Sequence, residues 1–235
     1  MAFLFNGRSP RNIDFNGNPV SKVVFGSAVI WEKVHRVKYI KSHGTEHIDT
    51  GFKPDSNTRV QITCEFYDLN TAGTAKGILG GRFVNGNSGI SVWHETHKGI
   101  IGKARLLFQY GNENSSFISG AFCGQDTKYI IDVNRNTLTC TTENGEEVLS
   151  RTDPECEFQS PASITIFAVH NLNNIDSRKG LFKLYGCKIW DNDVLVRDFI
   201  PCLDGAGTPC LYDEVERKFY YNSGTGNFEY EELEE

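Results

Sequence analysis

The sequence lacks the features of a membrane-spanning, secreted or nucleic-acid-binding protein. Its N-terminus has no basic region, and the apolar run there is far too short for a signal peptide or a membrane span, so we expect synthesis in a cytoplasm and no membrane insertion. No stripe of lysine and arginine is present: five acids fall within the last seven residues, and the rest of the chain carries 24 bases against 25 acids. Because a surface that binds a nucleic-acid duplex is strongly basic, nucleic acid is not an expected partner.

Disulfide motifs are also scarce. The seven cysteines form an odd set with no pair spaced Cys-x-x-Cys. This pattern favours reduced thiols that pack in the core as small hydrophobic side chains over a disulfide framework. Only Cys202 and Cys210 lie close enough in sequence to suggest a bridge that closes a loop, and that alternative stays open.

Helical patterns are absent as well, and the composition favours strands. The chain has a single methionine and no amphipathic run of helical period longer than about two turns. It has 16 phenylalanines, 9 tyrosines and 23 glycines, a mixture that suits pleated strands joined by many turns. The pattern predicts strands over residues 37–41, 59–67, 75–82, 89–93, 104–110, 128–133, 137–142, 163–169, 181–190, 194–201 and 218–222.

Two of these predicted strands indicate how the chain is layered. Residues 59–66 alternate, so that Ile62, Cys64 and their even-numbered neighbours point inward and polar side chains point outward. Residues 163–169 are almost continuously apolar or β-branched, as expected of a strand covered on both faces. One-sided and two-sided strands together predict an all-β fold, a two-sheet antiparallel β-sandwich.

Several motifs, in their order along the chain, resemble a known family. Concanavalin A-like (laminin-G-like) jelly-roll proteins of tailed phages and prophages of gut bacteria have an opening signature similar to residues 37–54, and a closing signature similar to residues 183–191, 195–201, 211–213 and 219–228. The resemblance covers roughly residues 36–230 and implies a jelly roll that is associated with a virion. The chain departs from the family pattern at Cys210, where glycine is expected, and at Glu46-His47, where Gln-Tyr is usual.

The first 35 residues form a separate unit in this scheme. Their strand patterns are too short to bury a core, so they must dock on the main domain or on a neighbouring subunit. Residues 20–27 and 30–33 resemble the short N-terminal β segments of phage minor structural proteins. We therefore predict a hairpin-like docking and oligomerisation segment over residues 1–35, a jelly roll over 36–230 and an acidic tail over 231–235. The side chains expected to dock are Phe15, Val23, Phe25, Ile30 and Trp31.

A carbohydrate site is the binding function that the sequence favours most. An aromatic ring can stack on the apolar face of a sugar while amide groups bind its hydroxyls. Two segments, residues 93–97 and 110–114, supply this mixture. The candidate residues are Trp93, His94, His97, Tyr110, Asn112 and Asn114. The alternative interpretation is that Trp93 and Tyr110 are ordinary strand residues packed inside the fold.

No catalytic residue is predicted, and no enzyme activity is expected. The Glu-x-Asp-x-x-Glu spacing that would pair two carboxylates on one strand does not occur, and the acidic cluster at residues 213–216 suits a solvated turn. Two histidines three residues apart at the end of a strand do not readily chelate a metal. No cofactor is expected; calcium alone stays open, with oxygen ligands in the loops at residues 191–193 or 171–176. Arg197 is expected to pair with Asp198 or Asp213 in a structural role.

These observations predict a phage virion structural protein, either a head decoration or head fibre or a tail or baseplate appendage. It would be made in the host cytoplasm, form a homo-oligomer and contact other virion proteins through residues 1–35. Its outward lectin-like jelly roll would bind host-surface carbohydrate through many weak sites. The alternatives are a free carbohydrate-binding lectin and a glycoside hydrolase of the same fold; the hydrolase would need an export signal and a carboxylate pair, and neither is found.

Overall fold

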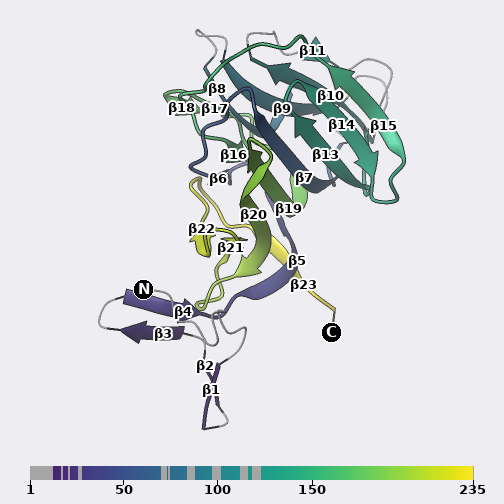
Figure 1. Cartoon of the computed structure of the whole chain (residues 1–235). Coiled ribbons are helices and arrows are strands. Elements are labelled where there is room, and N and C mark those ends of the chain that lie inside the picture. Colours follow the sequence, from purple (N-terminus) through teal and green to yellow (C-terminus); the bar gives the residue numbers. More distant parts are fainter. Residues whose placement is uncertain are drawn as a thin grey trace.

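A computed structural model gives the fold. It describes residues 13–16, 18–20, 22–25, 28–69, 73, 75–83, 88–96, 102–111, 116–117 and 123–234. These residues form strands and turns and contain no helix, so none of the described part provides a helix long and apolar enough to cross a membrane. Two large sheets lie over one another and make the body of the molecule (Figure 1).

The larger sheet has ten strands in the described part of the chain, and all their pairings are antiparallel. Strand β23 (Glu229–Glu232) lies off the main path and pairs with β5. The other nine strands, in spatial order, are β15 (Glu147–Thr152), β14 (Thr137–Thr142), β13 (Lys128–Asn134), β7 (Thr58–Phe66), β19 (Phe182–Asp191), β5 (His35–Lys41), β20 (Val194–Leu203), β21 (Pro209–Asp213) and β22 (Lys218–Tyr220).

The smaller sheet has nine strands in the same described residues. Its path runs through β11 (Ser116–Phe117), β10 (Lys103–Tyr110), β9 (Ser88–Thr96), β8 (Lys76–Phe83), β16 (Thr165–Ile166) and β6 (Ile48–Asp49). Three short strands lie off this path: β12 (Cys123–Gly124), β17 (His170–Asn171) and β18 (Asn174–Ile175). Strand β17 runs parallel to β8, whereas the other pairings of this sheet are antiparallel.

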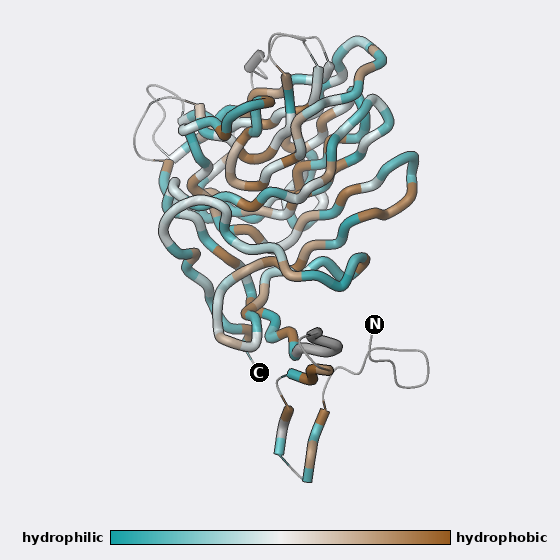
Figure 2. The backbone as a smooth tube through the Cα atoms, turned by 90° about the vertical axis from the view of Figure 1, so that its left-hand side faces the viewer, coloured by the Kyte–Doolittle hydropathy of each residue, from teal (hydrophilic) through white to brown (hydrophobic). Residues whose placement is uncertain are grey.

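Alternating side chains build the core between the two sheets. In β7 every second residue is buried, including Ile62, Cys64 and Phe66, and the residues between them face outward, as the sequence predicts. The inward side chains of β10, such as Leu106 and Phe108, meet them from the smaller sheet. Figure 2 shows the same alternation of apolar and hydrophilic residues along the strands of the body. The two-sheet antiparallel sandwich is confirmed.

The segment at residues 163–169 differs from its prediction. All seven residues are buried, as expected, but only Thr165–Ile166 form a strand. Phe167 has a φ of 68°, a left-handed conformation that ends the extended backbone. Its ring stacks on Phe182 with 4.4 Å between centroids and lies 5.1 Å from Phe228. The pattern of apolar residues therefore predicted burial correctly but did not predict the turn at Phe167, which packs its ring against Phe182 and Phe228.

The cysteines are free thiols, and six of the seven are buried. Cys202 and Cys210 are direct neighbours on β20 and β21, with 3.6 Å between their sulfur atoms. A second close pair, Cys123 and Cys140, joins the two sheets across the core at 3.8 Å. Six of the seven cysteines thus pack in the core as small side chains, as the sequence predicts.

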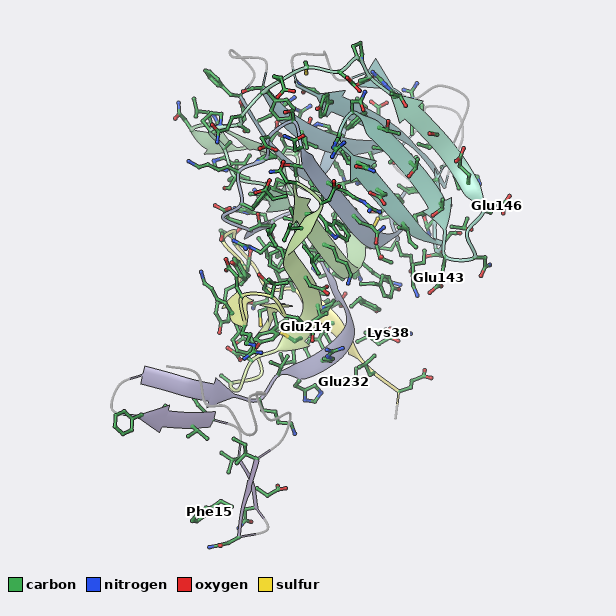
Figure 3. The ribbon with its side chains drawn as sticks, viewed as in Figure 1. Phe15, Lys38, Glu143, Glu146, Glu214 and Glu232 are labelled. Atoms are coloured by element: carbon green, nitrogen blue, oxygen red, sulfur yellow. The ribbon has the colours of Figure 1, made fainter. Side chains whose placement is uncertain are left out.

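The C-terminal segment continues the larger sheet further than the predicted boundary. Strand β23 pairs with β5 through residue 232, two residues into the stretch expected to be an acidic tail. The pairing places each acid beside a base, because Glu229 contacts Lys41 at 2.6 Å, Glu231 contacts Lys38 at 2.5 Å and Glu232 contacts His35 at 2.8 Å. Figure 3 labels Lys38 and Glu232 in this region. Ion pairs between facing residues of β23 and β5 thus help to hold most of the acidic run in a strand.

Two small hairpins precede the body. Strands β1 (Ile13–Phe15) and β2 (Asn18–Val20) form one, and β3 (Lys22–Phe25) and β4 (Ala28–Glu32) form the other. Both are two-stranded sheets that do not join the large ones, and they project from the body near the start of β5 (Figure 1).

The expected docking residues sit on these hairpins. Phe15 is 71% exposed, and Figure 3 shows it at the far end of the β1–β2 hairpin; Phe25 is 76% exposed and Val23 is half-buried. The side chains of Ile30 and Trp31, on β4, lie outside the described part of the structure. Exposed aromatic side chains on hairpins this short leave an apolar surface without a cover from the described residues of the same chain.

Candidate functional site

Trp93 is not exposed for stacking on a sugar. It lies on the outer face of the smaller sheet, but only 2% of it is accessible. The guanidinium groups of Arg82 and Arg178 lie over its ring, 5.1 Å and 4.7 Å from the ring centre. Its indole Nε1 donates a hydrogen bond to Ser91 Oγ at 3.1 Å. The predicted platform role of Trp93 does not fit this structure, because two guanidinium groups lie over its ring and its indole nitrogen is already bonded to Ser91.

His94 and Tyr110 point the other way, into the core. The ring centres of His94 and Phe66 lie 4.7 Å apart, and those of Tyr110 and Phe158 lie 5.1 Å apart. The hydroxyl of Tyr110 donates a hydrogen bond of 2.9 Å to the carbonyl oxygen of Ser56. Burial lowers the pKa of His94 to about 3 and raises that of Tyr110 to about 12.

The structure therefore does not bring the predicted sugar-binding residues together on one accessible surface. Trp93 faces outward but is covered, while His94 and Tyr110 are core residues. The alternation of strand residues explains the error for His94, since neighbours on a strand point to opposite faces. The other three candidates, His97, Asn112 and Asn114, lie outside the described residues.

A better candidate is an open hollow on the outer face of the larger sheet. It has a volume of about 330 Å³ and lies over β7, β19 and β20. Gly186 lines it at a β-bulge of β19, and a Cβ atom added there would meet only the carbonyl oxygen of Phe199, at 3.4 Å. The glycine thus leaves room where other strand residues would project. Its wall and rim include Tyr185, Gln61, Thr63, Lys188, Asp198, Ile200, Arg36 and Glu214.

The polar groups at the rim are ion pairs that present both donors and acceptors. Lys188 Nζ contacts Asp198 Oδ2 at 2.8 Å, and Arg36 pairs with Glu214, which Figure 3 labels. Lys188, Arg36 and Glu214 keep 42–50% of their side chains exposed. A ligand rich in hydroxyls could therefore exchange hydrogen bonds with either member of each pair.

Tyr185 is held firmly at one side of the hollow. Its hydroxyl donates to Glu65 Oε2 at 2.7 Å, and Lys128 Nζ lies 4.4 Å from its ring centre. Its ring also meets Tyr39 edge to face at 5.6 Å. Burial, followed by the bond to Glu65, raises the pKa of Tyr185, so it stays a neutral donor at any ordinary pH.

A strip of three aromatic side chains continues the surface from the hollow toward the edge of the sheet. Tyr212 is the direct neighbour of Ile200, which lines the hollow, and Phe219 is the neighbour of Tyr212 on the next strand. Tyr212 and Phe219 have ring centres 5.0 Å apart, and Phe219 stacks on Tyr221 at 6.3 Å. Tyr221 is 46% exposed. We call Tyr212, Phe219 and Tyr221 the aromatic strip.

The sequence carries a signal for the aromatic strip in the alternation of residues 219–221. Phe219 and Tyr221 alternate around Tyr220, which packs inward on Phe199, so the two outer rings share one face. The hollow carried no comparable signal, because it depends on a bulge at Gly186 and on residues brought together from four strands.

A calcium site finds no support in the described part of the chain. No group of three or more histidine, cysteine, aspartate or glutamate side chains there could hold a metal ion. In the two candidate loops, Asp176 binds Arg178 through both its oxygens at 2.9 and 2.8 Å, and Asp193 pairs with Arg135 at 3.2 Å. These carboxylates therefore already have cationic partners.

The predicted structural role of Arg197 can be placed more exactly. It lies 3.6 Å from Asp213, a fully buried carboxylate, and 2.7 Å from Glu216. Asp198 pairs instead with Lys188. Of the two alternatives, the pair with Asp213 is the one that forms.

Comparisons with known proteins support the fold. No family model matches the sequence, and no curated protein matches it. A "putative carbohydrate binding protein" from Bacteroides ovatus has a similar structure, with a TM-score of 0.55 and 13% sequence identity over 91% of this chain and 66% of that one.

Two further structures are more distant. One is a heptameric SAP-like pentraxin from Limulus polyphemus, with a TM-score of 0.48 and 11% identity over 68% of this chain and 78% of that one. The other is a tailspike protein of Escherichia coli O157:H7 bacteriophage CAB120, with a TM-score of 0.44 and 9% identity over 74% of this chain and 27% of that one. At these identities a likeness concerns the fold alone.

Proposed function

We propose that this protein binds carbohydrate on the outer face of its larger sheet, across the hollow and the aromatic strip. The observation that carries the proposal is their continuity: Ile200 lines the hollow and is the direct strand neighbour of Tyr212. Polar groups beside aromatic rings that are at least partly exposed are the combination that recognises a sugar, since hydroxyls need hydrogen bonds and the ring face needs an apolar contact. The similar fold of the Bacteroides ovatus protein, described as a carbohydrate binding protein, agrees with this function.

Binding without hydrolysis fits the charges at the hollow. A glycosidase of this kind needs one carboxyl group that holds a proton and a second that stays ionised. Here Asp198 is paired with Lys188 and Glu214 with Arg36, so both carboxylates at the hollow are already engaged in ion pairs. The proposal is therefore a binding protein and not an enzyme.

A glycan array tests this proposal. Wild-type protein is expected to bind a defined set of glycans, and Gly186→Leu is expected to lose that binding by at least tenfold because its side chain fills the hollow. Gly186 is not among the glycines with a positive φ, and a Cβ added there meets only the carbonyl oxygen of Phe199 at 3.4 Å, so the variant is expected to fold. Tyr212→Ala is expected to weaken the same glycans.

Thr141→Leu is the matched control, because Thr141 also faces outward on the larger sheet but lies on β14 and lines neither the hollow nor another pocket of the described residues. Its glycan profile is expected to match the wild type. Retention of full binding by both Gly186→Leu and Tyr212→Ala would remove this face as the binding site.

We further propose that the protein works as part of a phage particle, as a head or tail appendage that presents the jelly roll outward. Two observations favour this role: the resemblance of residues 36–230 to phage jelly-roll proteins, and the exposed Phe15 and Phe25 on hairpins outside the body. An apolar surface of this kind is typically covered by a partner, either another virion protein or a second copy of the chain. Many copies on one particle would then strengthen weak sugar binding through avidity.

Purified particles from the source of this sequence test the role. Mass spectrometry should detect the chain in them, and electron cryomicroscopy should place the two hairpins against another subunit. Absence from the particles would contradict the virion role and favour a free lectin.

In solution, replacing both Phe15 and Phe25 with aspartate should shift the oligomer to a monomer in light-scattering measurements. The melting temperature of the body should stay unchanged, because the two hairpins do not join its sheets. An unchanged oligomer would contradict docking through these two side chains.

A further inference from the structure

A second open hollow lies on the outer face of the larger sheet, over the neighbouring strands β13 and β14 (Figure 1). Its volume is about 410 Å³. The residues that line it include Asp132, Asn134, Thr137 and Thr139, which all face outward and are partly exposed. Carboxylate, amide and hydroxyl groups thus meet on a surface that an external ligand can reach. We call this site the second hollow.

A row of facing residues joins the second hollow to the hollow over Gly186. Gln61 lines the hollow over Gly186 and is the direct strand neighbour of Asp132, which lines the second hollow. Gln61 Nε2 also donates to Asp132 Oδ2 at 3.0 Å. The same register continues to both sides across six strands, from β15 to β20, through Ser150, Thr139, Asp132, Gln61, Lys188 and Asp198. Facing residues of neighbouring strands share one side of a sheet, so these side chains form a continuous polar row.

The polar row is open along its whole length. All its residues are at least partly exposed, and it contains no aromatic or apolar side chain that would separate the two hollows. Neighbouring strands lie about 4.8 Å apart, so a row across six strands is about 24 Å long. This length exceeds that of a single sugar ring several times over. A monosaccharide would therefore leave most of the polar row uncovered.

The charges along the polar row are paired with one another. Arg59 binds Asp132 twice, from Nε at 3.0 Å and from Nη2 at 2.5 Å, and Lys188 binds Asp198 at 2.8 Å. Each carboxylate of the row thus has a cation beside it. A surface balanced in this way favours a ligand without net charge over an anionic or a cationic one. Hydroxyl groups both donate and accept hydrogen bonds, so they suit the amide, hydroxyl and ion-paired groups of the row.

We propose that the binding site extends over both hollows and takes a long, linear, neutral glycan chain, which crosses the strands along the polar row. This inference rests on the proposed function, which concerns the hollow over Gly186 and the aromatic strip. Sugar units bound over Gly186 hold the next units of the same chain at a high effective concentration beside the second hollow. The affinity therefore depends on chain length, because only a long chain reaches both hollows.

Calorimetric titration with linear neutral oligosaccharides tests this extension. The probes are the disaccharides and hexasaccharides of glucose, mannose, galactose and N-acetylglucosamine, and the variants are measured with the series that wild-type protein binds best. The hexasaccharide of that series is expected to bind at least tenfold more tightly than its disaccharide. A high concentration of sodium chloride is expected to change either affinity by less than twofold, because the charges of the surface are already paired.

Thr139→Leu places a larger, apolar side chain in the second hollow and is expected to remove the gain from chain length. Its hexasaccharide affinity should fall to that of the disaccharide, and its disaccharide affinity should match the wild type. Thr141→Leu is the matched control, because it makes the same substitution two positions along the same face of β14, outside both hollows. It should keep the full gain. The urea midpoint of each variant checks that it is folded.

The extension and the proposed function fail in different ways. Equal affinity of the wild type for the two lengths would overturn the extension, and so would a full gain in Thr139→Leu. In both cases Gly186→Leu would still lose binding, and the proposed function would stand. Unchanged binding of both lengths by Gly186→Leu and Tyr212→Ala would instead overturn the proposed function. Tighter binding of a hexasaccharide of galacturonic acid would overturn the neutral class of ligand, and no binding of any probe would overturn both proposals.

Discussion

His94 provides a prediction about how the stability of the protein depends on pH. Its side chain is fully buried against Phe66, and neither ring nitrogen has a hydrogen-bond partner in the described part of the chain. Burial, with a smaller contribution from Lys76, lowers its pKa from 6.5 to about 3 in the folded protein. The folded state therefore keeps His94 neutral at a pH where the unfolded chain takes up a proton.

The sign and the size of the effect follow from this difference. Because the folded pKa is depressed, the stability is fully present above pH 6.5 and is lost as the pH falls from there toward 3. Between pH 7.5 and pH 5.0 the free energy of unfolding should fall by about 2 kcal/mol through this single histidine.

Replacing His94 with leucine should abolish this part of the pH dependence. It should also stabilise the protein by about 1 kcal/mol at neutral pH, because two buried polar atoms without partners are removed. His47, which is also buried with a lowered pKa, remains in both proteins, so the difference between them isolates His94.

Urea denaturation of the wild type and His94→Leu at pH 7.5 and 5.0 measures the effect. The wild type should lose about 2 kcal/mol more than the variant over this range. His35→Asn replaces an exposed histidine and is the control. Its free energy of unfolding should change between pH 7.5 and 5.0 as that of the wild type does. Equal acid sensitivity of wild type and His94→Leu would refute the reasoning, and so would a loss of stability in the variant at neutral pH.

Three further predictions follow from the packing. In the native protein only Cys156 should react quickly with a thiol reagent, because the other six thiols are buried and burial raises the pKa of thiols such as that of Cys187. All seven thiols should react after denaturation. A second thiol that reacts quickly in the native protein would contradict the packing. Deleting residues 229–235 removes β23 from β5 and should cost about 2–3 kcal/mol in thermal or urea unfolding, whereas an unchanged midpoint would show that the segment is a free tail. Phe167→Ala should cost about 3–5 kcal/mol, and a loss below about 1 kcal/mol would show that its ring is not part of the core.

Much of the fold could be predicted because alternating apolar and polar residues indicate which side chains of a strand are buried. Residues 59–66 alternate in sequence and in burial, and both edges of the resulting strand were placed within a residue. The short strands were harder: β23 was missed because the five acids of residues 229–235 suggest a solvated tail. The three acids that lie on β23 have lysine and histidine partners some 190 residues away in the sequence.

The candidate site could be predicted only in part. The pattern around Trp93 suggested an aromatic surface on β9, and the ring does face outward, but two arginines from distant segments cover it. Such coverage depends on tertiary contacts and leaves no local pattern. Gly186 gave no signal either, since its effect comes from a bulge in the pairing of β19 with β7.

The most direct test of the central claim is a crystal structure of the chain with the glycan that binds it best on an array. The sugar should lie on the outer face of the larger sheet, with its hydroxyls at the rim near Lys188 and Asp198 and a ring face against the aromatic strip. A glycan bound elsewhere, with the hollow over Gly186 filled only by water, would contradict the account.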